Sequence, residues 1–208
     1  MSYLYSESLK ADCDAYFTRN KGSEESFNRS TNLDVLRKYL KEEDEVLEVG
    51  CGDGKKVNTL TEGLGTTYTG IDISGKAIEA AKERFPNYCF KQSKGVRIDF
   101  DAGVFDFVYL GFFLYLLDRA HLALLVSEVD RVLKDGGILA ITDFGTRVQK
   151  QKKYSHDANL DIYKFNYASI FDAFPQYAIV EKCNHFQGEF NQDDDTWEET
   201  TILSKKHH

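Results

Sequence analysis

The chain has 208 residues, of which 42% are hydrophobic and 29% are charged, a composition typical of a globular domain with a substantial core. Its formal net charge is −8, and its basic residues form only pairs such as Lys152-Lys153 and Lys205-Lys206. A nucleic-acid-binding surface leaves a basic stripe in the sequence. The composition therefore argues against a nucleic-acid partner and favours a small molecule.

The cysteines argue against two further classes of protein. Cys13, Cys51, Cys89 and Cys183 lie far apart and form no C-x-x-C motif, so we expect neither a metal site nor a disulfide scaffold. No apolar stretch reaches membrane-spanning length, and the first residues lack the basic and apolar regions of a signal peptide. We expect a cytoplasmic protein with no membrane partner, while its oligomeric state stays open.

The first regular elements are predicted from residue 30 onward. Ser30 or Thr31 can cap a helix whose apolar face is Leu33, Leu36, Tyr39 and Leu40. An apolar strand over 46–49 then runs directly into three glycines at alternate positions, and a helix with Val57, Leu60 and Leu64 follows. A second strand over 68–71 ends on Asp72, roughly twenty residues after the glycines. This layout is typical of an α/β fold that binds a nucleotide-like ligand.

The glycine spacing separates two families with this layout. A dinucleotide-binding loop has the pattern G-x-G-x-x-G, because its pyrophosphate lies on the N-terminus of the next helix. Here Gly50, Gly52 and Gly54 are each two residues apart, Glu48 precedes them, and Asp72 follows at the end of the next strand. This pattern resembles motif I of the class I S-adenosylmethionine-dependent methyltransferases. The resemblance covers roughly residues 30–143 and implies S-adenosylmethionine as the cofactor.

Strands and helices continue to alternate after this segment. Ser74 can cap a helix that Pro86 ends, and short strands are predicted over 88–91, 105–110 and 138–142. Asp118 can cap a long helix before the last of these, closed by 135–137. Such alternation predicts a mostly parallel sheet with helices on both faces.

The C-terminal part departs from this alternation. Residues 144–165 are polar, with no clear period, and a short helix over 169–174 ends at Pro175. Two long runs, 177–186 and 196–203, are separated by an acidic turn and predict an antiparallel hairpin. The fold class is therefore α/β: a doubly wound, mostly parallel seven-stranded sheet with an antiparallel C-terminal hairpin, in one domain over 1–208. Residues 144–175 are interpreted as a substrate-side insert.

Residues 1–29 allow two interpretations. Their scattered apolar side chains, such as Leu4, Leu9 and Phe17, are compatible with a surface helix that closes the core. They are equally compatible with a helix across the cofactor mouth, because N-terminal helices act as lids in the family that the chain resembles.

The resemblance also implies roles for individual residues at the cofactor site. Asp72 would accept hydrogen bonds from the ribose hydroxyls, and Glu48 would help to hold the methionine amino group, with bonding of loop amides as its structural alternative. The glycines would let backbone approach the ligand, Cys51 would pack beside it rather than act as a nucleophile, and Ile73 would pack on adenine. Relatives often bind the adenine amino group with an acid, but here Lys94 takes that position. Lysine cannot accept a hydrogen bond, so Ser93 or a backbone carbonyl would do so.

Candidates for the transferring methyl group and the acceptor lie further along the chain. The carbonyl of Leu110 and the ring of Tyr115 are predicted beside the sulfonium, since an aromatic face stabilises a cation. His156 is the natural candidate base by its pKa, although a lone histidine in a polar loop is more often simply solvated. The acceptor-side candidates in the polar insert are Tyr154, His156, Tyr163, Lys164 and Tyr167.

The predicted function is methyl transfer from S-adenosylmethionine to a small molecule, by in-line displacement. Two alternatives share the fold. One is a non-catalytic module that binds the cofactor and regulates a partner. The other is an aminopropyltransferase, which would need a cluster of acids where this chain has Leu110-Gly111-Phe112.

Overall fold

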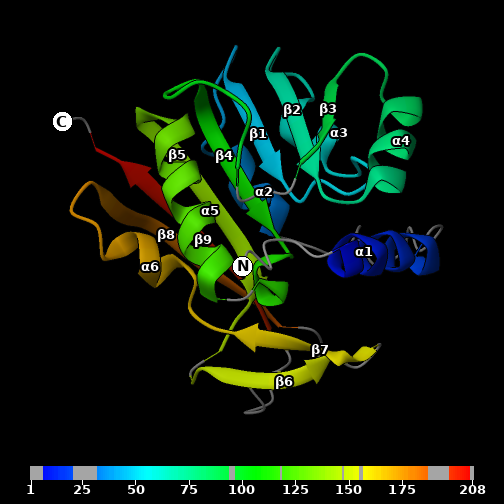
Figure 1. The fold of residues 1–208 in the computed structure, drawn as a ribbon. Helices are drawn as coiled ribbons and strands as arrows, with labels where there is room; N and C mark the ends of the chain where they lie inside the picture. The colour runs from blue at the N-terminus through cyan, green and yellow to red at the C-terminus, as the bar shows by residue number, and fades with distance from the viewer. Residues whose placement is uncertain are drawn as a thin grey trace.

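The computed structural model describes residues 7–20, 32–93, 97–117, 119–146, 148–154, 157–186 and 197–206. Its main sheet has seven strands in the order β3-β2-β1-β4-β5-β9-β8 (Figure 1). The parallel strands are β1 (Glu45–Val49), β2 (Thr67–Asp72), β3 (Cys89–Gln92), β4 (Phe105–Gly111) and β5 (Leu133–Phe144). The last two strands are β8 (Tyr177–Phe186) and β9 (Trp197–Lys205). β9 is antiparallel to both β5 and β8, which confirms the predicted sheet and its C-terminal hairpin.

Helices cover both faces of this sheet, as predicted. One core cluster packs α2 (Asn32–Arg37), α3 (Val57–Thr61) and α4 (Gly75–Arg84) against the sheet, and the other packs α5 (Arg119–Val132) and α6 (Ala168–Asp172). Figure 1 shows α5 in front of the sheet and α2 behind it. Because both faces are covered, β1 is buried along almost its whole length.

The helix boundaries agree with the sequence pattern only in part. The Ser74 hydroxyl accepts a hydrogen bond from the Ala77 amide at 3.1 Å, which confirms the predicted cap of α4. The helix predicted to reach Leu40 ends at Arg37, and Leu64 lies beyond the end of α3. The proposed capping residues Ser30, Thr31 and Asp118 lie outside the described residues.

The polar segment after β5 is regular, contrary to the sequence interpretation. It contains β6 (Lys150–Tyr154) and β7 (Asp157–Lys164), which form a separate antiparallel hairpin. Figure 1 shows this hairpin beyond the carboxyl ends of β4 and β5. The sequence concealed it because β6 reads Lys-Gln-Lys-Lys-Tyr, in which apolar and polar residues do not alternate. β5 is also longer than predicted, since Leu133 pairs with Phe105 across a bulge.

Helix α1 (Glu7–Asn20) lies beside the amino end of α4 (Figure 1). The Asp14 carboxylate accepts hydrogen bonds from the Ser74 hydroxyl at 2.5 Å and from the Lys76 amide at 3.3 Å. Ser74 is only two residues past Asp72. Thus α1 is joined to the segment that follows the predicted ribose-binding acid.

Candidate functional site

The loop between β1 and α3 has the backbone conformation that its glycines predict. Gly50, Gly52 and Gly54 have φ angles of 75°, 55° and 76°, a region that other residues adopt only with strain. The Gly50 amide donates to the Ile71 carbonyl at 2.8 Å, which ties the loop to the end of β2. A Cβ added to Gly52 would meet no atom within 4 Å, so this side of the loop is open to a ligand.

Asp72 stands at the end of β2, facing this loop. One carboxylate oxygen accepts from the Gly52 amide at 2.8 Å, and the other accepts from the Ser74 amide at 2.8 Å. Burial raises the pKa of Asp72, although these amides oppose the shift. The side chain is only partly buried, and each carboxylate oxygen can accept a second hydrogen bond. The residue therefore has acceptor capacity for two further donors.

Glu48 lies fully buried beneath the glycine loop. Its two oxygens accept from the Lys56 ammonium at 2.5 Å and from the Tyr68 hydroxyl at 2.6 Å. Burial lowers the pKa of Lys56, but Glu48 beside it more than offsets that effect, so the pKa rises above its ordinary value. In this structure Glu48 thus supports the loop by binding the side chains of Lys56 and Tyr68. Its position in the motif did not predict these two contacts.

Cys51 packs under the same loop, as the sequence interpretation expects. A Cβ on Gly70 would lie 2.8 Å from the Cys51 sulfur, so the thiol occupies the space that Gly70 leaves. Burial raises the pKa of this thiol well above its ordinary value. The thiol therefore stays protonated, which is unfavourable for a nucleophile.

The segment predicted to bind adenine follows β3. The Ser93 amide donates to the Asp72 carbonyl at 2.8 Å, while its hydroxyl donates to the Arg97 carbonyl at 3.1 Å. Ile73 is half-buried, and its carbonyl accepts from the side chain of Gln92. Lys94 lies outside the described residues.

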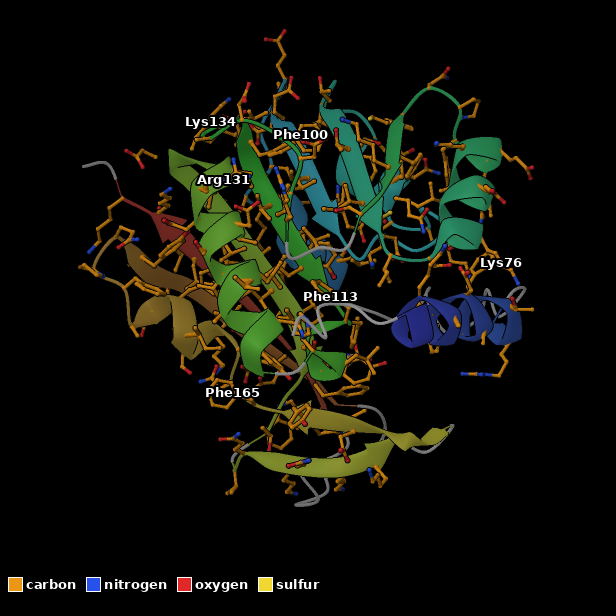
Figure 2. The ribbon with its side chains drawn as sticks, in the orientation of Figure 1. Lys76, Phe100, Phe113, Arg131, Lys134 and Phe165 are labelled. Atoms are coloured by element: carbon orange, nitrogen blue, oxygen red, sulfur yellow. The ribbon has the colours of Figure 1, made fainter. Side chains whose placement is uncertain are left out.

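Helix α5 fixes the chain on the far side of this segment. Arg131 donates to the carbonyls of Phe100 and Ile98, each at 2.7 Å (Figure 2). Glu128 accepts from the Ile98 amide at 2.8 Å and pairs with Arg131. These two side chains hold residues 98–100 of the β3–β4 connection, and the sequence interpretation missed both.

The carboxyl end of β4 turns sharply into a cluster of aromatic rings. Leu110 is fully buried between Val49 of β1 and Ile141 of β5. Phe112 has a φ of 57°, which is uncommon for a bulky residue and typical of a functional site. This turn places Phe113 against Gly50, below the end of β4 (Figure 2).

Tyr115 lies in the short 3₁₀ helix η2 (Leu114–Leu116) that follows this turn. Its side chain is buried, and its ring contacts Phe144 edge-on at a centroid distance of 5.0 Å. The ring of Phe112 also packs on Phe144, at 5.9 Å. The predicted neighbour of the sulfonium thus belongs to an aromatic wall at the ends of β4 and β5.

Asp143, at the end of β5, adjoins this wall, and the sequence interpretation missed both it and Phe144. Asp143 is 3% exposed, and its oxygens accept from the amides of Phe144 at 2.7 Å and Tyr115 at 3.3 Å. Burial raises the pKa of Asp143 to about 7, although the backbone amides and Lys164 lower it. The sequence did contain a signal for Asp143, because this acid follows an apolar parallel strand directly, as Asp72 does.

The structure brings together only some of the residues predicted to face the acceptor. The Lys164 ammonium lies 4.4 Å from the centroid of the Phe144 ring. Tyr167 lines a small pocket with Asp143 and Phe144, and its hydroxyl donates to the Tyr163 carbonyl. Tyr163 points to the opposite face of β7 from Lys164, because neighbouring side chains alternate along a strand. His156 and the side chain of Tyr154 lie outside the described residues.

Within the described ranges, no group of three or more histidine, cysteine, aspartate or glutamate side chains is arranged to hold a metal ion. The helices seen in those same parts of the chain include none that is both long and apolar enough to cross a membrane.

Comparison with known proteins finds relatives of the segment that carries the glycine loop and Asp72. Residues 46–137 match the methyltransferase domain family. An uncharacterized methyltransferase of Synechocystis sp. is 34% identical over 126 residues, which cover 61% of this chain and 58% of that protein. The 2-methyl-6-phytyl-1,4-hydroquinone methyltransferase of the same organism is 34% identical over 110 residues, or 51% of this chain and 34% of that protein. The chain therefore spans only part of the length of these relatives.

The fold agrees with that match. The crystal structure of an S-adenosylmethionine-dependent methyltransferase from Methanosarcina mazei superposes with a TM-score of 0.69 at 21% identity, covering 84% of this chain and 98% of the other. The family match, the glycine loop with Asp72 and the seven-stranded sheet agree with one another. The matched segment is thus similar to the methyltransferase domain family, and the chain has the fold of a solved S-adenosylmethionine-dependent methyltransferase.

Proposed function

We propose that this protein transfers a methyl group from S-adenosylmethionine to a small-molecule acceptor. The observation that carries the proposal is Asp72, held by the Gly52 and Ser74 amides with acceptor capacity left for two ribose hydroxyls. Hydroquinone and menaquinone methyltransferases among the relatives support a small acceptor. The net charge of −8 supports the same class.

The residues present fit this cofactor. Gly50, Gly52 and Gly54 would bring the backbone close to it, with Asp72 on the ribose and with Ile73 and Ser93 beside the adenine. When bound, S-adenosylmethionine supplies a methyl group made electrophilic by a positively charged sulfur. The Leu110 carbonyl and the Tyr115 ring would lie on the side of that charge, because both stand where β4 ends.

The protein's part in the reaction is mainly alignment and exclusion of water. The hairpin β6–β7 and η2 contact each other beyond the ends of β4 and β5, where ligands bind in open α/β sheets. Holding an acceptor there in line with the methyl group can lower the barrier by roughly 7–11 kcal/mol. Under this proposal α1 acts as a cover, joined through Asp14 to the Ser74 that follows the ribose site.

The test is calorimetric titration with S-adenosylhomocysteine, the demethylated product of the cofactor. We expect the unmodified protein to bind it, and Asp72→Ala to weaken binding by at least about tenfold, since hydrogen bonds to a charged acceptor are strong. Asp72→Asn separates loss of charge from loss of the loop contacts, and Glu79→Ala, exposed on α4, is the control.

Either of two results would contradict the proposal. If the folded protein does not bind S-adenosylhomocysteine, the glycine loop is not a binding site for this cofactor. If Asp72→Ala and Asp72→Asn bind it as well as the control does, Asp72 does not hold the ribose. Binding without transfer to any acceptor in a broad panel would instead favour the non-catalytic alternative.

A further inference from the structure

The hairpin β6–β7 has two chemically different faces. Lys150 pairs in register with Lys164, whereas Lys153 pairs with Asp161. Because side chains alternate along a strand, Lys150, Lys152 and Lys164 share one face, which we call the inner face. Lys153 lies on the other face, where its ammonium bonds the Asp161 carboxylate at 3.0 Å.

The inner face is directed toward the ends of β4 and β5. Lys164 is 6% exposed, and its ammonium lies over the ring of Phe144 at 4.4 Å. Phe144 is the last residue of β5, and its ring touches Tyr115. Strand β7 also packs on η2, which carries Tyr115. Lys164 on the inner face therefore lies beside the position that we propose for the methyl acceptor.

The three lysines are close enough to influence one another. Burial lowers the pKa of Lys164, and the charges of Lys152 and Lys150 lower it further, while Asp143 opposes these effects. With a pKa of about 7, Asp143 is only partly ionised at neutral pH and opposes them only in part. Three lysine side chains are thus gathered at this site, beside the pocket that Asp143 and Glu199 line, in a chain whose net charge is −8.

We propose that the inner face of the hairpin binds an oxyanion, a carboxylate or phosphate, carried by the methyl acceptor. This inference rests on the proposed function and deepens it by naming the class of acceptor. Ammonium groups form strong, charge-assisted hydrogen bonds with oxyanions. The rings of Phe144 and Tyr115 supply an apolar wall for the body of the same molecule. Anchoring the anion fixes the position of the atom that receives the methyl group.

The experiment compares two adjacent lysines on opposite faces of β6. The protein saturated with S-adenosylhomocysteine is titrated with benzoate, with benzamide as its uncharged analogue, and with inorganic phosphate. We expect benzoate to bind more tightly than benzamide, and more weakly as KCl is raised. Lys152→Met should weaken benzoate binding about three- to tenfold, and Lys150→Met/Lys152→Met should weaken it further. Lys153→Met is the matched control and should leave binding unchanged.

Each other outcome contradicts the proposal in a distinct way. Equal binding of benzoate and benzamide, or no binding of either, means that the inner face does not select an anion. Equal effects of Lys152→Met and Lys153→Met place any anion elsewhere. Binding of phosphate alone assigns the lysines to a free inorganic anion rather than to the acceptor. If the protein does not bind S-adenosylhomocysteine in the first step, the proposed methyl transfer itself is contradicted. This result is distinct from a failure to bind benzoate, which contradicts only the anion site.

Discussion

The Lys56 ammonium lies 2.5 Å from the Glu48 carboxylate in a pair buried directly beneath the glycine loop. The side chains of Lys56 and Glu48 are 5% and 0% exposed, so neither charge has water as an alternative partner. Removing one member of such a pair leaves an uncompensated buried charge. This pair is a contact on which the shape of the loop depends.

We therefore predict that Lys56→Met destabilises the protein by about 3–5 kcal/mol. The adjacent Lys55→Met should cost less than Lys56→Met, because the pair that Lys55 forms with Asp53 is long, at 3.9 Å, and both of its side chains keep some exposure to solvent. Urea unfolding of both variants measures the difference. Similar losses for the two substitutions would show that the buried pair has no special role.

The contact between Gly50 and Phe113 predicts a second difference in stability. Gly52→Ala should cost about 1–2 kcal/mol, from its positive φ alone, since its added Cβ meets no atom. Gly50→Ala should cost more, because its Cβ would lie 2.7 Å from the Phe113 ring. Phe113→Ala should reduce the excess cost of Gly50→Ala when the two are combined, as measured by thermal unfolding. Strict additivity of the two changes would contradict this prediction.

Asp143 predicts a pH dependence of stability. Its pKa is about 7 in the folded state and about 3.9 in an unfolded chain. Between these values the folded state binds more protons, so stability falls as pH rises. Relative to Asp143→Asn, the unmodified protein should lose about 2–3 kcal/mol between pH 5 and pH 8. Denaturant unfolding at both pH values gives the comparison, and a difference independent of pH would mean that Asp143 is ionised throughout.

The contact of α1 with α4 predicts a local change in dynamics. Asp14→Ala removes the acceptor of the Ser74 hydroxyl and the Lys76 amide, so amides of α1 should exchange with solvent roughly five- to tenfold faster. Hydrogen exchange measured by mass spectrometry reports this directly. Arg19→Ala, also on α1 and exposed, is the control. Equal exchange in both variants would show that Asp14 does not hold the helix.

Much of the fold could be predicted from local patterns. A buried parallel strand is apolar along its length, and a serine before a helix binds that helix's own amides, so β1 and the cap of α4 were evident. The hairpin β6–β7 was not evident, because the short strand β6 has no alternation of apolar and polar residues. In the folded protein Lys164 of this hairpin contacts Phe144 of β5, which is twenty residues away in the sequence.

For the candidate site, the sequence by itself determined the loop of Gly50, Gly52 and Gly54 and the acid at Asp72. Backbone conformation and spacing along two adjacent strands are local properties, and they leave a readable pattern. Only the tertiary structure decided that Glu48 binds Lys56, that Phe113 covers Gly50, and that Asp143 meets Lys164 and Tyr115. These contacts depend on the directions of side chains from different elements and on the water that packing removes. Neither the directions of these side chains nor their burial can be predicted from the sequence of a single segment.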